Sequence, residues 1–339
     1  MAELRWNPMI KDWTMVASHR QNRPQMPKDW CPFCPGEDNP KVPKDYDVFM
    51  YPNDFPALSQ TPPAMDHAYT DEAAALYGQR ESYGKCEVIL FSPDHHGTLW
   101  GLSREHIRKV VDLWCERFEE MSADEKIKYV FIFENRGDAV GVTMPHPHGQ
   151  IYGFSVLPKK IELELDAARE FKQENGKCLF CAMNEEESRF GIAEGKNRVI
   201  YENDSFIAYV PYFADYAYGV YITAKAHKLY ITDFDDAGKN DLADVLKVVT
   251  GAYDSLFDNR FPYMMCMHNG PVNCCGDYPD LRDFYHFHIE FYPPMRSETK
   301  QQFMASSETG VWAHCNPTAP EEKAAELRAA VEKFIKSGK

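Results

Sequence analysis

The sequence predicts an α+β fold built from two copies of one unit. A set of five features occurs twice in the same order along the chain, which indicates an internal repeat. Each copy also contains one long amphipathic helix that leads into an aromatic-rich extended stretch. With 339 residues, 44% of them hydrophobic and 26% charged, the chain is large enough to bury the core that this fold needs.

The repeated features are a Cys-x-x-Cys pair, an Asn-Asp pair, a histidine, an asparagine and a His-x-His pair. The first copy supplies Cys31/Cys34, Asn53/Asp54, His95, Asn135 and His146/His148. The second copy supplies Cys178/Cys181, Asn203/Asp204, His227, Asn269 and His286/His288. Five matches in one order make duplication the simplest explanation.

Apolar residues recur at steps of three or four in each copy, which predicts two amphipathic helices. The residues are Ile107, Val110, Trp114, Phe118 and Met121 in the first copy and Leu242, Val245, Val249, Ala252 and Leu256 in the second. Strand candidates follow at 129–135 and 261–269. Each His-x-His pair lies in a further extended stretch, so its two side chains are expected to share one face.

The two copies meet in a charged, helical-looking connector at 159–177, and the C-terminal segment predicts one more helix. We therefore expect an N-terminal domain at 1–172 and a C-terminal domain at 173–339.

The charge and the N-terminus limit the kinds of partner. A formal net charge of −15 argues against a nucleic-acid or an anionic-membrane partner. The N-terminus lacks a basic segment followed by an apolar one, and no apolar run approaches the roughly 18 residues of a membrane span. A soluble cytoplasmic protein is the expectation.

Paired cysteines in a cytosolic protein favour metal binding over disulfides. Zinc takes four tetrahedral Cys and His ligands, and a Cys-x-x-Cys turn supplies two of them. The first copy offers Cys31, Cys34, His95 and His146, which leaves His148 free.

The second copy offers Cys178, Cys181, His227 and His286 by the same logic. A rival set is Glu164, His268, His286 and His288, which suits iron or zinc. Because both sets use His286, they exclude each other. Four protein ligands in either site indicate a structural rather than a catalytic metal.

His148 is the candidate nucleophile of the first copy. An imidazole with the ordinary pKa of about 6.5 is mostly neutral at pH 7 and can attack a phosphorus atom whose charge is neutralised. Gly149 would let the backbone approach a phosphate, and Gln150 can donate a hydrogen bond without exchanging a proton. Asn135 adds another neutral donor.

The motif PHPHGQ at 145–150, with ENRG, SPDH and Cys-x-x-Cys upstream, resembles the galactose-1-phosphate uridylyltransferases of the histidine-triad (HIT) superfamily. The resemblance covers nearly the whole chain. It implies two duplicated HIT-like domains, each an antiparallel sheet with a long helix, whose sheets combine into a half-barrel.

The resemblance also implies a ping-pong reaction of galactose metabolism. His148 would attack the α-phosphorus of UDP-glucose and expel glucose 1-phosphate, and galactose 1-phosphate would then take the uridylyl group to give UDP-galactose. Gln150 would hold the uridylyl-histidine intermediate. Hydrolytic relatives tend to carry a third histidine at that position, so Gln150 favours transfer.

The resemblance further implies which residues contact the substrate and how many subunits the protein has. It implies Asn53 and Asp54 at the uracil and ribose, Asn135 and Thr143 at the phosphates, and Arg20, Arg23 and Glu308 elsewhere in the substrate site. It also implies a homodimer.

Two departures from the family pattern concern the second metal site and the hexose site, and a further observation concerns the difference between the two halves of this chain. The second Cys-x-x-Cys pair favours Cys178, Cys181, His227 and His286 as ligands. Ile289 and Glu290 replace Gly149 and Gln150 in the second copy, which indicates that one half does the chemistry. Ser307 and His314 stand where the family has other residues, so the hexose preference is open.

Two other functions fit the same motifs. One is a related nucleotidyl transferase or phosphorylase that uses another nucleotide sugar, such as ADP-glucose. The other is a non-catalytic, zinc-stabilised nucleotide-binding module.

Overall fold

The computed structural model describes residues 2–22, 30–36, 39–65, 73, 76–142, 144–274 and 276–338. The strands are β1 (Ala2–Asn7), β2 (Asp12–Ala17), β3 (Phe49–Pro52), β4 (Gln79–Glu81), β5 (Gly84–Leu90), β6 (Tyr129–Arg136), β7 (His148–Phe154), β8 (Val199–Glu202), β9 (Phe206–Tyr209), β10 (Val220–Ala224), β11 (Tyr263–His268) and β12 (His288–Tyr292). The helices are α2 (Arg104–Ser122), α3 (Lys159–Asn175), α4 (Leu179–Glu187), α5 (Asp236–Leu256), α6 (Leu281–Phe284), α7 (Ser306–Val311) and α8 (Pro320–Lys336).

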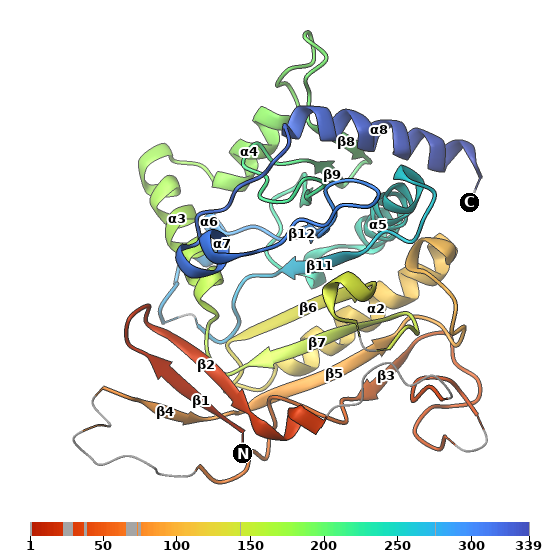
Figure 1. Cartoon of the computed structure of the whole chain (residues 1–339). Coiled ribbons are helices and arrows are strands. Elements are labelled where there is room, and N and C mark those ends of the chain that lie inside the picture. The colour runs from red at the N-terminus through yellow and green to blue at the C-terminus, as the bar shows by residue number, and fades with distance from the viewer. Residues whose placement is uncertain are drawn as a thin grey trace.

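One large antiparallel sheet runs through both halves of the chain (Figure 1). Its described strands follow the order β3-β5-β7-β6-β11-β12-β10-β9-β8. The order is symmetric about the β6–β11 pair, because β3, β5, β7 and β6 correspond to β9, β10, β12 and β11. A second, three-stranded sheet with the order β2-β1-β4 lies beside the N-terminal half.

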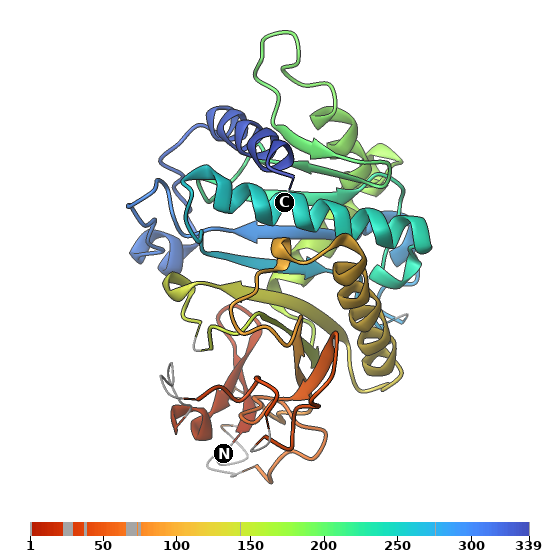
Figure 2. The same ribbon diagram turned by 90° about the vertical axis from the view of Figure 1, so that its right-hand side faces the viewer.

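The two long helices cover one face of the large sheet (Figure 2). Ser103 caps α2 by accepting a hydrogen bond from the His106 amide, and Asp235 caps α5 in the same way at Gly238. The apolar face of α2, including Ile107 and Trp114, is fully buried in a core shared with α5. The predicted helices, the strands that follow them and the helical connector are thus confirmed.

Helix α8 packs on the outer side of α5 and beside β8 (Figures 1 and 2). A Cβ atom at Gly251 would lie 2.4 Å from the ring of Phe334, so only glycine allows this contact.

The domain boundary expected between residues 172 and 173 lies inside α3 and stays a prediction. Among the described helices, none is both long enough and apolar enough to cross a membrane.

A buried charged group lies where β6 meets β11, at the junction of the two halves. Glu134 on β6 is 4% exposed and accepts a hydrogen bond from the Tyr263 hydroxyl at 3.2 Å. Burial raises the pKa of Glu134 from 4.5 to about 7, although the Arg136 guanidinium opposes the shift. The folded protein therefore holds this proton more tightly than the unfolded chain does.

We expect Glu134→Gln to stabilise the protein above pH 7. The stability gained from protonated Glu134 is complete below pH 4.5 and is lost as the pH rises through about 7. Glutamine does not titrate, so the free energy of unfolding should rise by about 1–3 kcal/mol at pH 8 and change little at pH 4.5. Urea unfolding at both pH values measures this, and an equal effect at both would contradict the assignment.

Candidate active site and metal centres

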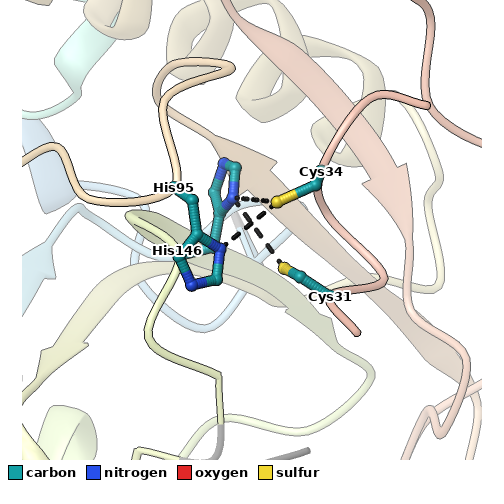
Figure 3. A group of neighbouring side chains, drawn as sticks. All are labelled: Cys31, Cys34, His95 and His146. Atoms are coloured by element: carbon teal, nitrogen blue, oxygen red, sulfur yellow. Dashed lines mark hydrogen bonds between the residues drawn. The ribbon is translucent and has the colours of Figure 1, made fainter. Parts of the chain in front are cut away.

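Four predicted ligands meet beside the His-x-His segment of the first half (Figure 3). Cys34 Sγ lies 3.2 Å from His95 Nδ1 and 3.5 Å from His146 Nδ1, and Cys31 Sγ lies 3.9 Å from His146 Nδ1. A tetrahedral zinc ion with bonds of about 2.0–2.3 Å separates its ligands by about 3.3–3.8 Å. The three separations lie within about 0.1 Å of this range, so the four side chains form a candidate metal site.

Local contacts shape this group. The Asn39 side chain donates hydrogen bonds to the carbonyls of Pro32 and Cys34 at 2.9 and 3.0 Å, which holds the cysteine turn. His146 Nε2 donates to the Ser92 carbonyl at 2.8 Å, so Nδ1 remains available as a metal ligand. Burial, together with the neighbouring Cys31 thiol, raises the pKa of Cys34 to about 12. A bound cation would lower it by stabilising the thiolate.

His148 begins β7 and lies next to this group. Its Nδ1 is 2.7 Å from the His146 carbonyl. A carbonyl only accepts hydrogen bonds, so Nδ1 carries the proton and Nε2 keeps its lone pair. The ring of Phe33 packs 5.0 Å from the His148 ring and 6.2 Å from that of His146. The cysteine turn thereby contributes to the orientation of His148.

A cavity of about 800 Å³ opens over His148. Its described lining residues are Trp30, Cys31, Pro32, Phe33, Cys34, Pro35, Gly36, Asn39, Pro40, Lys41, Tyr51, Asn53, Asp54, Phe55, Val88, Met144, His148 and Gln150. The volume suits a nucleotide-sized ligand. The candidate nucleophile and the predicted Asn53-Asp54 pair therefore border one space.

Gln150 lies two residues after His148 on the same strand and lines the same cavity. The Tyr152 hydroxyl donates to Gln150 Oε1 at 3.1 Å, which leaves the amide NH₂ group as a donor. Gly149 also has a role in packing, and its expected approach to a phosphate stays a prediction. A Cβ atom there would lie 3.0 Å from the Phe91 ring, so the glycine allows core packing on the opposite face of the strand.

The other predicted substrate residues are spread more widely. Asn135 borders a small cavity that also touches His148. Arg20 lies in the 3-10 helix Ser18–Asn22 and Glu308 in the first turn of α7, and neither is among the described residues that line the cavity over His148. Arg23 and Thr143 lie outside the described residues.

The second half repeats the metal group contact by contact. Cys181 Sγ lies 3.5 Å from His227 Nδ1 and 3.6 Å from His286 Nδ1, and Cys178 Sγ lies 3.9 Å from His286 Nδ1. His286 Nε2 bonds the Ala224 carbonyl at 2.9 Å, as His146 bonds Ser92. A hydrogen bond from the Cys181 thiol lowers the pKa of Cys178 to about 7.

The structure divides the rival ligand set. His286 lies with the cysteines, whereas Glu164, His268 and His288 form a third group together with Glu290. His268 Nδ1 is 2.9 Å from Glu164 and its Nε2 is 3.1 Å from Glu290. Although burial opposes the shift, these two carboxylates raise the pKa of His268 to about 9. Glu290 was not among the predicted ligands of this group.

This third group fills the position that the cavity occupies in the first half. His288 is the counterpart of His148, and Phe180 packs 4.6 Å from its ring, as Phe33 packs on His148. His288 is nevertheless only 1% exposed. Helix α3 places Glu164 close to His268 and Lys160 against Glu290. In the second half, the space that corresponds to the cavity over His148 is therefore occupied by side chains of the protein.

Two family models match consecutive parts of the chain. The N-terminal domain of galactose-1-phosphate uridyl transferase matches residues 1–158, and the C-terminal domain matches residues 164–336. The chain belongs to the galactose-1-phosphate uridylyltransferase family. The family resemblance of the PHPHGQ motif is thus confirmed.

Individual members of the family and solved structures agree with this. The galactose-1-phosphate uridylyltransferase of Thermotoga maritima is 41% identical over 97% of this chain and 98% of its own. A solved uridylyltransferase is 31% identical, with a TM-score of 0.86 over 98% of this chain and 99% of its own. An ADP-glucose phosphorylase from Arabidopsis thaliana shares the fold, with 23% identity and a TM-score of 0.72 over 97% of this chain and 99% of its own.

Proposed function

We infer that this chain catalyses the reaction after which its family is named. It moves UMP from UDP-glucose to galactose 1-phosphate and yields glucose 1-phosphate and UDP-galactose. The observation that carries the proposal is the position of His148, which lines a nucleotide-sized cavity together with Gln150 while its Nδ1 is bonded to the His146 carbonyl.

In the first half-reaction, His148 Nε2 attacks the α-phosphorus of UDP-glucose. The bond from that phosphorus to the bridging oxygen breaks, and glucose 1-phosphate leaves with the electron pair. The hydrogen bond from Nδ1 to the His146 carbonyl stabilises the positive charge that develops on the ring. In the second half-reaction, a phosphate oxygen of galactose 1-phosphate attacks the uridylyl-histidine and restores the free imidazole.

Gln150 holds the transferred group without taking part in proton transfer. With its oxygen bound by Tyr152, its NH₂ group can donate to a phosphoryl oxygen. The group that leaves in the first step and the group that attacks in the second are both phosphates, so neither step needs a proton donor or acceptor. Asn135 and Thr143 are proposed as further phosphate contacts, and Arg20, Arg23 and Glu308 as substrate residues that come into place with substrate or a second subunit.

We propose zinc at both Cys₂His₂ groups, where it fixes the cysteine turns. The group of Glu164, His268, His288 and Glu290 has donor types that iron or zinc accepts. Metal analysis of Cys181→Ser against His268→Ala separates the two possibilities in the second half. Loss of metal in His268→Ala alone would reject the Cys₂His₂ assignment there.

The proposed architecture is a duplicated HIT-like unit whose two sheets form a half-barrel, with domains at 1–172 and 173–339. The symmetric strand order and the paired contacts of the two halves support the duplication.

The proposed assembly is a homodimer, which light scattering on the purified protein tests.

The direct test of function is formation of UDP-galactose from UDP-glucose and galactose 1-phosphate. We expect turnover with these substrates and at most slight turnover of ADP-glucose with inorganic phosphate. The reverse preference would favour a phosphorylase, and binding of nucleotide without any turnover would favour a non-catalytic module.

We expect Gln150→Glu to lower kcat/KM by about 100-fold or more, because a carboxylate there repels the diphosphate in a partly enclosed site. Gln150→Ala is the matched control and should lose only about 10-fold, since it removes a donor without adding charge. Steady-state kinetics with UDP-glucose measures both variants. Equal losses would show that charge at this position does not matter.

A further inference from the structure

The cavity over His148 contains a second polar group at the Asn53-Asp54 pair. Asp54 Oδ1 accepts a hydrogen bond from Lys41 Nζ at 2.6 Å, and Asp54 Oδ2 accepts one from the Tyr51 hydroxyl at 2.7 Å. Among the described lining residues, Lys41 and Asp54 are the two with opposite formal charges, and they are paired with each other. Each carboxylate oxygen is therefore held by a separate donor.

The two donors differ in how firmly they are fixed. Tyr51 is 2% exposed, and its ring packs 5.2 Å from that of Phe33, which also contacts His148. Its hydroxyl therefore has one defined position. The Lys41 side chain is 60% exposed, so its ion pair contributes little to folding stability. The Lys41–Asp54 ion pair is therefore better explained by its effect on the geometry and charge of the cavity than by its effect on stability.

The chemistry of Asp54 limits what it can recognise. An ionised carboxylate only accepts hydrogen bonds, and each oxygen has a second acceptor position left after binding Lys41 or Tyr51. Two acceptors fixed side by side match two adjacent hydroxyl donors. A carboxylate also repels phosphate, so its place is at the nucleoside end of a nucleotide whose α-phosphate is at His148.

We propose that Lys41 and Tyr51 are positioning residues that fix the Asp54 carboxylate for the 2′,3′-diol of the nucleotide ribose. The proposal rests on the proposed function for the location of the nucleotide. It makes the cavity selective for ribonucleotides over 2′-deoxyribonucleotides. Lys41 also offsets the charge of Asp54, which lets an anionic substrate enter.

A neighbouring observation supports the role of Tyr51 as a permanent donor. Burial and the hydrogen bond to Asp54 raise the pKa of the Tyr51 hydroxyl well above its usual range. The hydroxyl therefore keeps its proton at neutral pH and donates a hydrogen bond to Asp54. Asn53 Oδ1 accepts a hydrogen bond from the Phe55 amide at 2.9 Å, which shapes the turn that carries Asp54.

The test compares the affinities of UDP and 2′-deoxy-UDP by titration calorimetry. Wild type should bind UDP about 10-fold or more tightly than 2′-deoxy-UDP. In Lys41→Met and in Tyr51→Phe the ratio should fall to about 3-fold or less. Lys44→Met is the matched control, an exposed lysine of the same segment that is not among the described lining residues, and it should keep the wild-type ratio.

Kinetics adds a second readout. In both variants the KM for UDP-glucose should rise about 10-fold while kcat stays within about twofold, because binding rather than the transition state is affected. Thermal unfolding of Lys41→Met, whose side chain is largely exposed, should match wild type.

Two results would overturn the proposal. An unchanged affinity ratio with both affinities also unchanged, in both variants, would mean that Asp54 does not need these donors. Equal losses of UDP and 2′-deoxy-UDP affinity would place Lys41 on the phosphates instead. A protein that shows the expected affinity ratios but no turnover would reject the proposed function and keep this inference.

Discussion

Replacement of His148 by asparagine is expected to lower kcat by about 10⁴-fold or more, because an amide nitrogen cannot form the covalent intermediate. Binding of UDP-glucose should change little, since asparagine fits the space and the cavity walls come mainly from other residues. Turnover of UDP-glucose with galactose 1-phosphate, together with calorimetric binding, separates these two effects.

His288→Asn is the matched control for this experiment. His288 has the same contacts as His148, with its Nδ1 3.0 Å from the His286 carbonyl, but it is buried among Glu164, His268 and Glu290. Its replacement should reduce stability and leave kcat per folded molecule close to wild type. A His148→Asn variant with more than about one hundredth of wild-type kcat would show that another group is the nucleophile.

The second large effect concerns the metal group of the first half. Cys31→Ser should lose one metal per chain and lower the free energy of unfolding by about 3–5 kcal/mol, because the site binds metal only when folded. Cys31, Phe33 and Cys34 also line the cavity, so the KM for UDP-glucose should rise. Metal content by emission spectroscopy, unfolding in urea and steady-state kinetics measure the three changes.

Two cysteine variants act as controls. Cys178→Ser removes the equivalent ligand in the second half, so it should also lose one metal but leave the KM nearly unchanged. Cys315→Ser replaces an exposed cysteine outside the three groups and should change nothing. A full metal complement in Cys31→Ser would contradict the ligand assignment.

Both Cys₂His₂ groups were predictable because their defining spacing is local. A Cys-x-x-Cys turn brings two ligands together without help from the rest of the fold, and the internal repeat identified the histidines. The long helices were predictable for the same reason, because their apolar periodicity is a local property. The position of Asn53 and Asp54 in the cavity over His148 also followed from the motif.

The features that the sequence did not reveal depend on long-range packing. Glu290 joins the third group because β12 pairs with β11 beside His268, while α3 brings Glu164 to the same histidine. Lys41 and Tyr51 meet Asp54 across a turn with no motif of its own. Phe91, which follows β5, packs on Gly149, and this contact joins segments that are far apart in the sequence.

In the proposed reaction, His148 carries the uridylyl group between two phosphates. Incubation with UDP-glucose labelled at the α-phosphate, without galactose 1-phosphate, should release about one equivalent of glucose 1-phosphate. It should leave an acid-labile label on the peptide that contains His148, and His148→Asn should remain unlabelled. Formation of UDP-galactose by an enzyme that never takes up label would contradict the claim, as would a label on any other residue.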